Sequence, residues 1–246
     1  MDFKQAIFKR RSRRAYINEP LAQGIVDELQ QAADECNEDS GLHVQMITND
    51  RDPFRGLGKS YGIFSGVRNY FAMVGSTDDP DMEEKTGYYG ERLLLKAVAL
   101  GLGTCWIGGS YDRESCKCEI AEGEELKCVI AFGIVSPNES IKEAVMRKAT
   151  HRNSKEIKDM LKTKKGERAP NWVVEGMRCV TAAPSSMNRQ PVSFLYSDGA
   201  ATAKVNGDRE YDMVDLGIAK LHFAIGAGKG KWDFGNGGIF IYEEEI

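Results

Sequence analysis

Residues 179–196 read CVTAAPSSMNRQPVSFLY and connect the end of an amphipathic helix to an apolar strand. Pro184 and Pro191 interrupt both periodic patterns, so the residues between the prolines form a loop. Small polar groups fill that loop: Ser185, Ser186, Asn188, Arg189 and Gln190. Carboxamides and hydroxyls both donate and accept, which suits the edge of a polar ring, although Asx and Ser turns would have the same composition.

The composition bounds the class of protein. The chain has 246 residues, of which 41% are hydrophobic and 28% charged, enough for one large domain or two small ones. A net charge of −4 provides no basic field for nucleic acid. Residues 1–16 contain no apolar signal segment, and Lys96 interrupts the apolar run at 93–103. We therefore expect a cytoplasmic protein without a membrane or nucleic-acid partner.

The cysteines and histidines do not suggest a metal site. The six cysteines are scattered along the chain, and only Cys116 and Cys118 are close together. The three histidines have no ligand spacing. We expect free thiols in a reducing compartment.

Helical and strand patterns follow one another without strict strand–helix–strand alternation, which favours the α+β class. Before residue 162 the patterns predict a short helix at 2–9, a helix at about 21–36, strands at 42–49 and 69–76, a long helix within 78–103, a buried central strand at 127–136 and a helix at 153–161. After a Lys/Gly/Pro-rich stretch they predict a helix at 172–182, strands at 192–197 and near 202–207, a helix at 211–227 and a last strand at 237–245.

The order of elements repeats. Residues 25–47 overlay 173–195, and AVALGLG at 97–103 overlays HFAIGAG at 222–228. Similar element orders also arise by chance, but glycines at the same helix end in both halves favour a degenerate duplication. We therefore predict a first repeat at 1–160, a linker at 161–171 and a shortened second repeat at 172–246, intertwined as one structural unit.

A basic cluster, KRRSRR, occupies residues 9–14. Guanidinium forks match phosphate oxygens in pairs, and Ser12 adds a hydroxyl donor. A solvated basic surface would have the same composition. Because Tyr16 and Ile17 follow, we expect the cluster to be docked on the protein rather than to form a loose tail.

Two more segments contain candidate binding groups. GLGTCWIGG at 101–109 follows a helix, and its last glycines would let a backbone N–H approach a flat ligand. A helix end followed by a core tryptophan is the plainer interpretation. MRKATHRNSKEI at 146–157 places His151 and Arg152 before a helix, where either an anion site or a solvated basic turn would fit.

Together these segments resemble the FMN-dependent nitroreductase family. RRSxR near the N-terminus, APSSxNxQP between helix and strand, and GxGTxWIGG after a long helix carry the resemblance. In ordinary members the PSxxNxQP loop follows soon after RRSxR. Here that early position holds ECNEDSGLH at 35–43, and the loop occurs only in the second half.

The resemblance implies a nitroreductase-like three-layer α/β/α fold with mixed, largely antiparallel sheets. Family members are intertwined dimers with FMN between the subunits, so this chain is similar to such a dimer joined into one polypeptide. RRSRR, WIGG and HR stand in the first half and PSSMNRQP in the second. The expected molecule is a monomeric pseudo-dimer with one FMN per chain and no partner subunit.

The family motifs also imply roles for single residues. The phosphate and ribityl end would be held by Arg10, Arg11, Ser12, Arg14 and Arg152. The ribityl chain and pyrimidine edge would be lined by Pro184, Ser185, Ser186, Asn188 and Gln190. The central ring, where a backbone N–H can bond to N5, would be faced by Trp106, Gly108 and Gly109. No side chain is assigned as a catalytic acid or base.

The reaction implied is hydride transfer from NAD(P)H to FMN, followed by reduction of a small electron acceptor such as a nitroaromatic or a quinone in a ping-pong cycle. Flavin reduction for a partner and reductive dehalogenation are open alternatives on the same fold. A further alternative is a non-catalytic flavin-binding protein. An RNA-binding patch is disfavoured because no aromatic residues alternate with the arginines.

Overall fold

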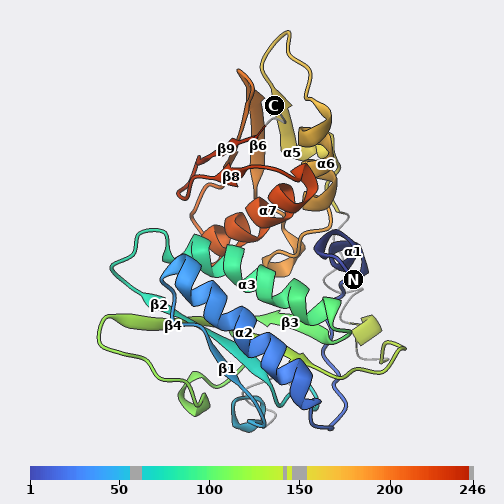
Figure 1. Ribbon diagram of the computed structural model, residues 1–246, viewed down its shortest axis with the longest axis vertical. Coiled ribbons are helices and arrows are strands. Elements are labelled where there is room, and N and C mark those ends of the chain that lie inside the picture. Colours follow the sequence, from blue (N-terminus) through green and yellow to red (C-terminus); the bar gives the residue numbers. More distant parts are fainter. Residues whose placement is uncertain (56–62, 141–142, 146–153, 244–246) are drawn as a thin grey trace.

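The computed structural model describes residues 1–55, 63–140, 143–145 and 154–243. Two of its long helices, α3 (Met82–Ala99) and α7 (Asp212–Ala227), lie between two β-sheets (Figure 1). One sheet belongs to the first half of the chain (residues 1–160) and the other to the second half (residues 161–246). Among the strands of the described residues, one neighbouring pair is parallel and the others are antiparallel, so the predicted α+β class with largely antiparallel sheets is confirmed.

The described part of the first half contains, besides α3, the elements α1 (Phe3–Lys9), α2 (Gln23–Ser40), β1 (Gln45–Ile47), η1 (Asp52–Phe54), β2 (Tyr70–Ser76), β3 (Gly103–Ile107), η2 (Arg113–Ser115), β4 (Glu124–Gly133) and α5 (Ile157–Met160). α2 runs further than its predicted end because the left-handed residue that stops it is Gly41, with φ +73°.

The first sheet has the spatial order β1-β2-β4-β3, with antiparallel neighbours. β4 lies between β2 and β3 and is buried over its last eight residues, which confirms the central strand predicted from its apolar run. β3 was not predicted, because the glycines around it suggested only a helix end. In the structure Gly101, with φ +90°, turns the chain out of α3, and the strand begins two residues later.

The second half contains, besides α7, the elements β5 (Leu161–Thr163), α6 (Asn171–Val180), η3 (Ser186–Asn188), β6 (Ser193–Ser197), β7 (Ala200–Lys204), β8 (Lys231–Trp232) and β9 (Ile239–Ile241). From α6 onward the chain runs helix, strand, strand, long helix, strand, strand, as it does from α2 to β4. The order β6-β7-β9-β8 also matches β1-β2-β4-β3, with the last strand inserted between the second and the third.

The segment predicted as a linker, 161–171, begins with a strand. β5 pairs in parallel with β6 and forms the edge of the second sheet. The Lys- and Gly-rich residues that suggested a linker form the turn between β5 and α6. The connection between the halves is therefore hydrogen-bonded to the second sheet along its first three residues.

α3 and α7 cross so closely that their backbones touch. A Cβ on Gly87 would lie 2.0 Å from the carbonyl oxygen of Val214, and a Cβ on Gly217 would lie 1.9 Å from that of Glu84. Val214 lies three positions before Gly217, and Glu84 lies three positions before Gly87. Each glycine therefore contacts the residue three positions before the other glycine, so the two contacts are reciprocal. Reciprocal contacts of this kind are the pattern that two-fold-related elements produce.

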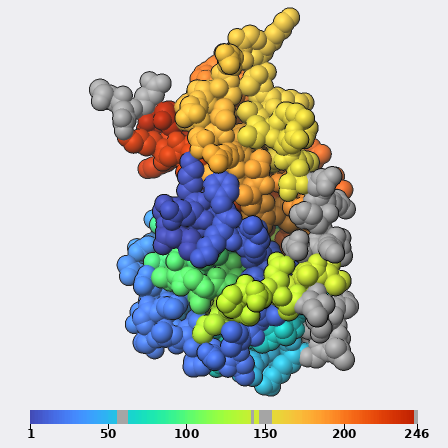
Figure 2. Space-filling view, turned by 90° about the vertical axis from the view of Figure 1, so that its right-hand side faces the viewer, coloured from blue at the N-terminus to red at the C-terminus, as the bar shows by residue number. Residues whose placement is uncertain are grey.

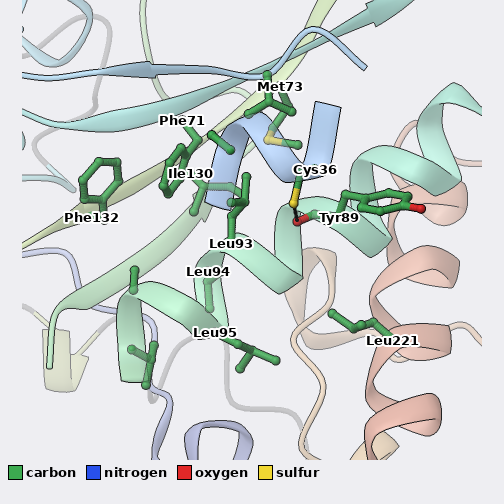
Figure 3. Packing of buried hydrophobic residues seen from close by; sticks show 14 of the residues in the cluster. Cys36, Phe71, Met73, Tyr89, Leu93, Leu94, Leu95, Ile130, Phe132 and Leu221 are labelled. Atoms are coloured by element: carbon green, nitrogen blue, oxygen red, sulfur yellow. Dashed lines mark hydrogen bonds between the residues drawn. The ribbon is translucent and has the colours of Figure 1, made fainter. Parts of the chain in front are cut away.

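The main core lies where the first sheet meets α2 and α3 (Figure 3). Phe71 and Phe132 stack there with ring centroids 4.5 Å apart. The adjacent residues Leu93 and Leu94 of α3 point to different sides of the helix, yet both are fully buried, because α3 has the sheet on one side and α7 on another. Leu221 of α7 belongs to the same cluster, so the core continues across the helix crossing.

The glycine crossing can be tested by adding a methyl group to it. Gly217→Ala should force α3 and α7 apart and lower the free energy of unfolding by about 1–3 kcal/mol, as overpacking does. Chemical denaturation measures the change. Gly24→Ala in α2 is the control, because no described atom outside its own turn lies within 4 Å of the new Cβ. That variant should gain about 0.5–1 kcal/mol, and a gain at Gly217 would contradict the close crossing.

Candidate functional site

The basic segment after α1 is fixed to the edge of the first sheet. α1 ends at Lys9 and is capped by Arg10, whose N–H bonds to the Ala6 carbonyl, and the chain then runs beside β3. Ser12 forms a parallel bridge with Thr104, and the Arg13 N–H donates to the Thr104 carbonyl at 2.8 Å. The prediction that the cluster is docked is confirmed. Figure 2 shows this dark-blue segment where the first half meets the orange second half.

One arginine of the basic cluster forms an ion pair within the protein. Arg13 Nε pairs with Glu143 at 3.1 Å, and the Arg14 backbone N–H donates to the same carboxylate at 2.7 Å. Burial by itself raises the pKa of Glu143, but hydrogen bonds from the Arg14 and Ser140 backbone and from Arg13 lower it to about 2. Glu143 therefore stays ionised and anchors the basic segment.

Arg10 and Arg14 both have guanidinium N–H groups without a partner among the described residues. Arg10 Nη1 reaches Ser12 Oγ at 3.3 Å, but its buried Nε has no partner among the described residues. The Arg14 guanidinium has no hydrogen bond or ion pair to any described residue. Arg11 is exposed and donates to backbone carbonyls at the end of α1. Because a buried donor without a partner is unfavourable, the Nε of Arg10 is a group to which a ligand could bond.

Trp106, near the end of β3, faces the core. Its ring fills the space that a Cβ on Gly90 would take, at 2.5 Å, and its Nε1 donates to Glu91 Oε2 at 2.7 Å. The tryptophan thus fixes the end of β3 against α3. This placement agrees with the plainer interpretation of the segment, a helix end followed by a core tryptophan.

The two glycines after β3 have different surroundings. A Cβ on Gly108 would lie 2.6 Å from the ring of Tyr211, the residue before α7. At Gly109 no described atom lies within 4 Å of the corresponding position. Gly108 therefore makes room for a tyrosine of the second half, and Gly109 has open space beside it.

The backbone of the loop at 184–191 is strained. Met187, Asn188 and Gln190 have φ values of +54°, +51° and +47°, in the left-handed region that residues with a Cβ rarely adopt. The Ser186 N–H donates to both oxygens of Asp215, at 2.9 and 3.1 Å. Strain of this kind persists only where surrounding contacts fix it, and it is concentrated at binding and catalytic sites.

Gln190 ties the loop to two other segments. Its Nε2 donates to the Thr181 carbonyl at 3.3 Å, and its Oε1 accepts the Lys155 N–H at 2.8 Å. Lys155 Nζ donates to the Gln190 carbonyl at 2.8 Å, and the Gln190 N–H donates to Ser185 Oγ at 2.8 Å. Gln190 is buried, so its carboxamide is used to shape the loop.

The end of β3 lies against the second half of the chain. Trp106 and Tyr211 both pack on a small buried cluster formed by Ala183, Val214 and Ile218. Ala183 directly precedes the 184–191 loop. The structure thus brings the glycine segment of the first half together with the loop and the start of α7. Arg152, expected at the phosphate, lies outside the described residues.

Sequence reasoning missed three residues of this region: Glu91, Tyr211 and Asp215. Glu91 and Asp215 leave a weak signal, because each is a charged residue at a core-facing position of a helix. Tyr211 leaves no signal in the sequence, because only the fold places its ring beside Gly108.

A hollow of about 260 Å³ opens elsewhere, between α1, α2 and α3. Its lining, which includes Phe3, Cys36, Arg92 and Lys96, shares no residue with the predicted site. Beneath the 184–191 loop the remaining space is about 10 Å³, room for about one water molecule. The loop is therefore packed tightly on α7.

The described residues contain no group of His, Cys, Asp or Glu side chains that could hold a metal ion. Among the helices they form, none combines the length and apolar character needed to cross a membrane. All six cysteines are free thiols.

Comparison with known proteins supplies the family. Residues 2–227 match the family model described as "Putative TM nitroreductase". The match extends over nearly the whole chain, and the protein therefore belongs to this nitroreductase family. A search of curated proteins gives no match.

Solved structures share the fold. One described as a "putative nitroreductase", from Thermotoga maritima, is 21% identical with a TM-score of 0.62, over 98% of this chain and 92% of that chain. Nitroreductases with bound FMN from Bacteroides fragilis and Desulfitobacterium hafniense are 13% and 16% identical. Their TM-scores are 0.45 and 0.46, over 57% and 56% of this chain and 92% of each of theirs. The first likeness covers 98% of this chain, and it concerns the fold.

Asp215 provides a pH test of the support for the loop. Burial is the main cause that raises the pKa of Asp215 to about 7, and the nearby Asp212 also raises it. The hydrogen bond from the Ser186 N–H and the charge of Arg189 lower it, but by less. Between the unfolded-state value of 3.8 and about 7, the folded protein keeps a proton that the unfolded chain has lost. Stability therefore falls as pH rises through this range and is constant above it.

Asp215→Asn removes this titration. Its stability relative to the wild type should increase from pH 5 to pH 8, by up to about 2.7 kcal/mol. Thermal unfolding of both proteins at each pH measures the difference. A difference that does not change with pH would contradict the raised pKa of Asp215.

Proposed function

We propose that the protein is an FMN-dependent oxidoreductase that takes hydride from NAD(P)H and reduces a small acceptor such as a nitroaromatic or a quinone. The observation that carries this proposal is the junction of the two halves. There the end of β3, with the basic segment at its edge, meets the 184–191 loop and the start of α7. Membership of the nitroreductase family supports the same reaction class.

The donors at the junction fit a flat cofactor that carries a phosphate. Arg10 has a buried Nε without a described partner, and the Arg14 guanidinium is uncommitted among the described residues. Two such cations suit the oxygens of a phosphate monoester. The open space beside Gly109 suits close approach of a ring to the backbone. We assign the phosphate to Arg10, Ser12 and Arg14, and to Arg152 on its motif alone.

The loop of the second half would supply the remaining contacts. Ser186 and Asn188 are assigned to the ribityl chain and ring edge, while Pro184, Ser185 and Gln190 hold the loop in its strained form. FMN supplies the two-electron chemistry when it is bound. The side chains of the protein bind and orient it, and none is assigned as an acid or base.

We also propose that the halves derive from a duplication and that each chain binds one FMN. The common strand order and the reciprocal glycine contacts support the duplication. After β8, at the position that corresponds to the end of β3, Phe234 packs on Tyr88 and Tyr89 with ring centroids 5.8 and 6.2 Å apart. Lys220 and Glu84 form a buried ion pair beside them. These contacts support the proposal that residues of the chain fill the second position.

The absorption spectrum of the purified protein tests the cofactor. We expect a yellow protein that releases about one FMN per chain and has the mass of a single chain in solution. A colourless preparation that takes up no added FMN would contradict the proposal, and two FMN per chain would contradict the filled second position.

Paired substitutions test whether one site spans both halves. Arg14→Ala should weaken FMN binding about 10- to 100-fold, as expected for a lost charge-assisted hydrogen bond, and Asn188→Ala about fivefold. Fluorescence titration of the apoprotein measures both affinities. Arg55→Ala removes an exposed arginine that pairs with Asp52 and is the control, with no change expected. If only one of the two site variants has an effect, the cross-half site is wrong.

Turnover with NAD(P)H and a series of acceptors separates the alternatives. Reduction of nitroaromatics or quinones supports the proposed reaction, whereas exclusive reduction of free flavin or loss of halide from a haloaromatic indicates another chemistry on the same fold. Bound FMN without any turnover indicates a flavin-binding protein.

A further inference from the structure

A fully buried carboxylate joins elements of both halves beneath the candidate site. Glu91 of α3 accepts from Trp106 Nε1 through Oε2 at 2.7 Å and lies 3.0 Å from His222 Nε2 through Oε1. Glu91 and His222 have no exposed side-chain surface. His222 belongs to α7, and its Nδ1 lies 3.1 Å from the Cys179 carbonyl oxygen of α6. Glu91 thereby links β3 to α7 and, through His222, to α6.

The partners of His222 determine where its protons lie. The Cys179 carbonyl only accepts, so Nδ1 carries a hydrogen. The second ring nitrogen, Nε2, faces Glu91 Oε1. A proton must lie between these two atoms, because without it both would be acceptors and could form no hydrogen bond. The Glu91–His222 pair is net neutral whichever atom holds that proton, so no unpaired charge is buried at the crossing of α3 and α7.

Glu91 also acts on Arg10. Burial lowers the pKa of Arg10, and Glu91 is the strongest influence in the opposite direction. None of the described carboxylates bonds directly to Arg10, so its guanidinium is supported by a nearby acid without being occupied by one. The same residue therefore influences the basic segment and holds the strand beside it.

We propose that Glu91 is a positioning residue of the cofactor site. It holds Trp106, and with it the end of β3 that continues into Gly108 and Gly109, at a fixed place relative to Arg10 and the 184–191 loop. The inference rests on the proposed function for its ligand. The placement of Trp106 by Glu91 does not depend on that ligand and can be measured without it.

Two substitutions separate the contacts of Glu91 from its volume. In Glu91→Gln the amide oxygen can accept from Trp106 and the amide nitrogen can donate to His222 Nε2, so both contacts survive. Glu91→Leu has a similar volume and makes neither contact. Leu93→Ala is the matched control, because Leu93 is fully buried in the same helix and lines the separate hollow between α1, α2 and α3.

The first measurement is the indole N–H resonance of Trp106 in ¹⁵N-labelled apoprotein. It should shift strongly in Glu91→Leu, little in Glu91→Gln and not at all in Leu93→Ala. The second is the Kd for FMN, which should rise at least about tenfold in Glu91→Leu and stay within about threefold of the wild type in Glu91→Gln and Leu93→Ala. The Tm should fall in both Glu91→Leu and Leu93→Ala.

A lower Tm in Glu91→Leu with an unchanged Kd would show a purely structural role and overturn the inference. Should Glu91→Leu fail to fold, Glu91→Asp takes its place, because its shorter side chain should shift the Trp106 resonance and weaken FMN binding. If the wild type binds no FMN, the proposed function fails, and an unshifted Trp106 resonance in the variants separately overturns the positioning role.

Discussion

The touching backbones of α3 and α7 constrain the whole molecule. Gly87 and Gly217 remove the side chains that would otherwise separate the helices. At this distance Leu221 of α7 reaches the core of the first half. The start of α7 reaches β3, where Tyr211 fills the space beside Gly108. The junction that we assign to the cofactor exists because two helices from different halves lie this close.

The register of the crossing is defined by two acids of α3. Glu84 pairs with Lys220 at 2.5 Å, and Glu91 faces His222 at 3.0 Å. Burial raises the pKa of Glu84, although Lys220 lowers it, so the pair gains less stability than its short distance suggests. A slip of α7 by one turn would separate both acids from their partners on α7. These contacts therefore select one arrangement of the helices.

The sequence predicted the elements that have either a clear helical period or an unbroken apolar run. α3, α7 and β4 are long and have clear ends, so local pattern sufficed for them. β8 has two residues and β3 lies among glycines, so neither leaves a period to detect. β5 was expected to be part of a linker, because its pairing with β6 is a non-local contact that composition does not encode.

The residues of the candidate site also fall into two groups, those that the sequence predicted and those that it did not. The motifs supplied Arg10, Arg14 and the polar loop, since those segments are continuous in sequence. Glu91 and Tyr211 belong to the region only through tertiary contacts, and one sequence gives no means to pair them with Trp106 and Gly108. The loop motif alone also gave no sign that Gln190 bonds within the protein.

The common strand order of the two halves has a consequence for how such a molecule can change. In an assembly of two identical chains, every substitution appears at both ends of the two-fold axis. Here the two ends are encoded separately. In the duplication that we propose, one end keeps arginines and open space beside Gly109, whereas Phe234 packs on Tyr88 and Tyr89 at the other. The contact between the halves is also intramolecular, so it does not weaken on dilution. Each end is thus free to acquire its own substitutions without disturbing the other.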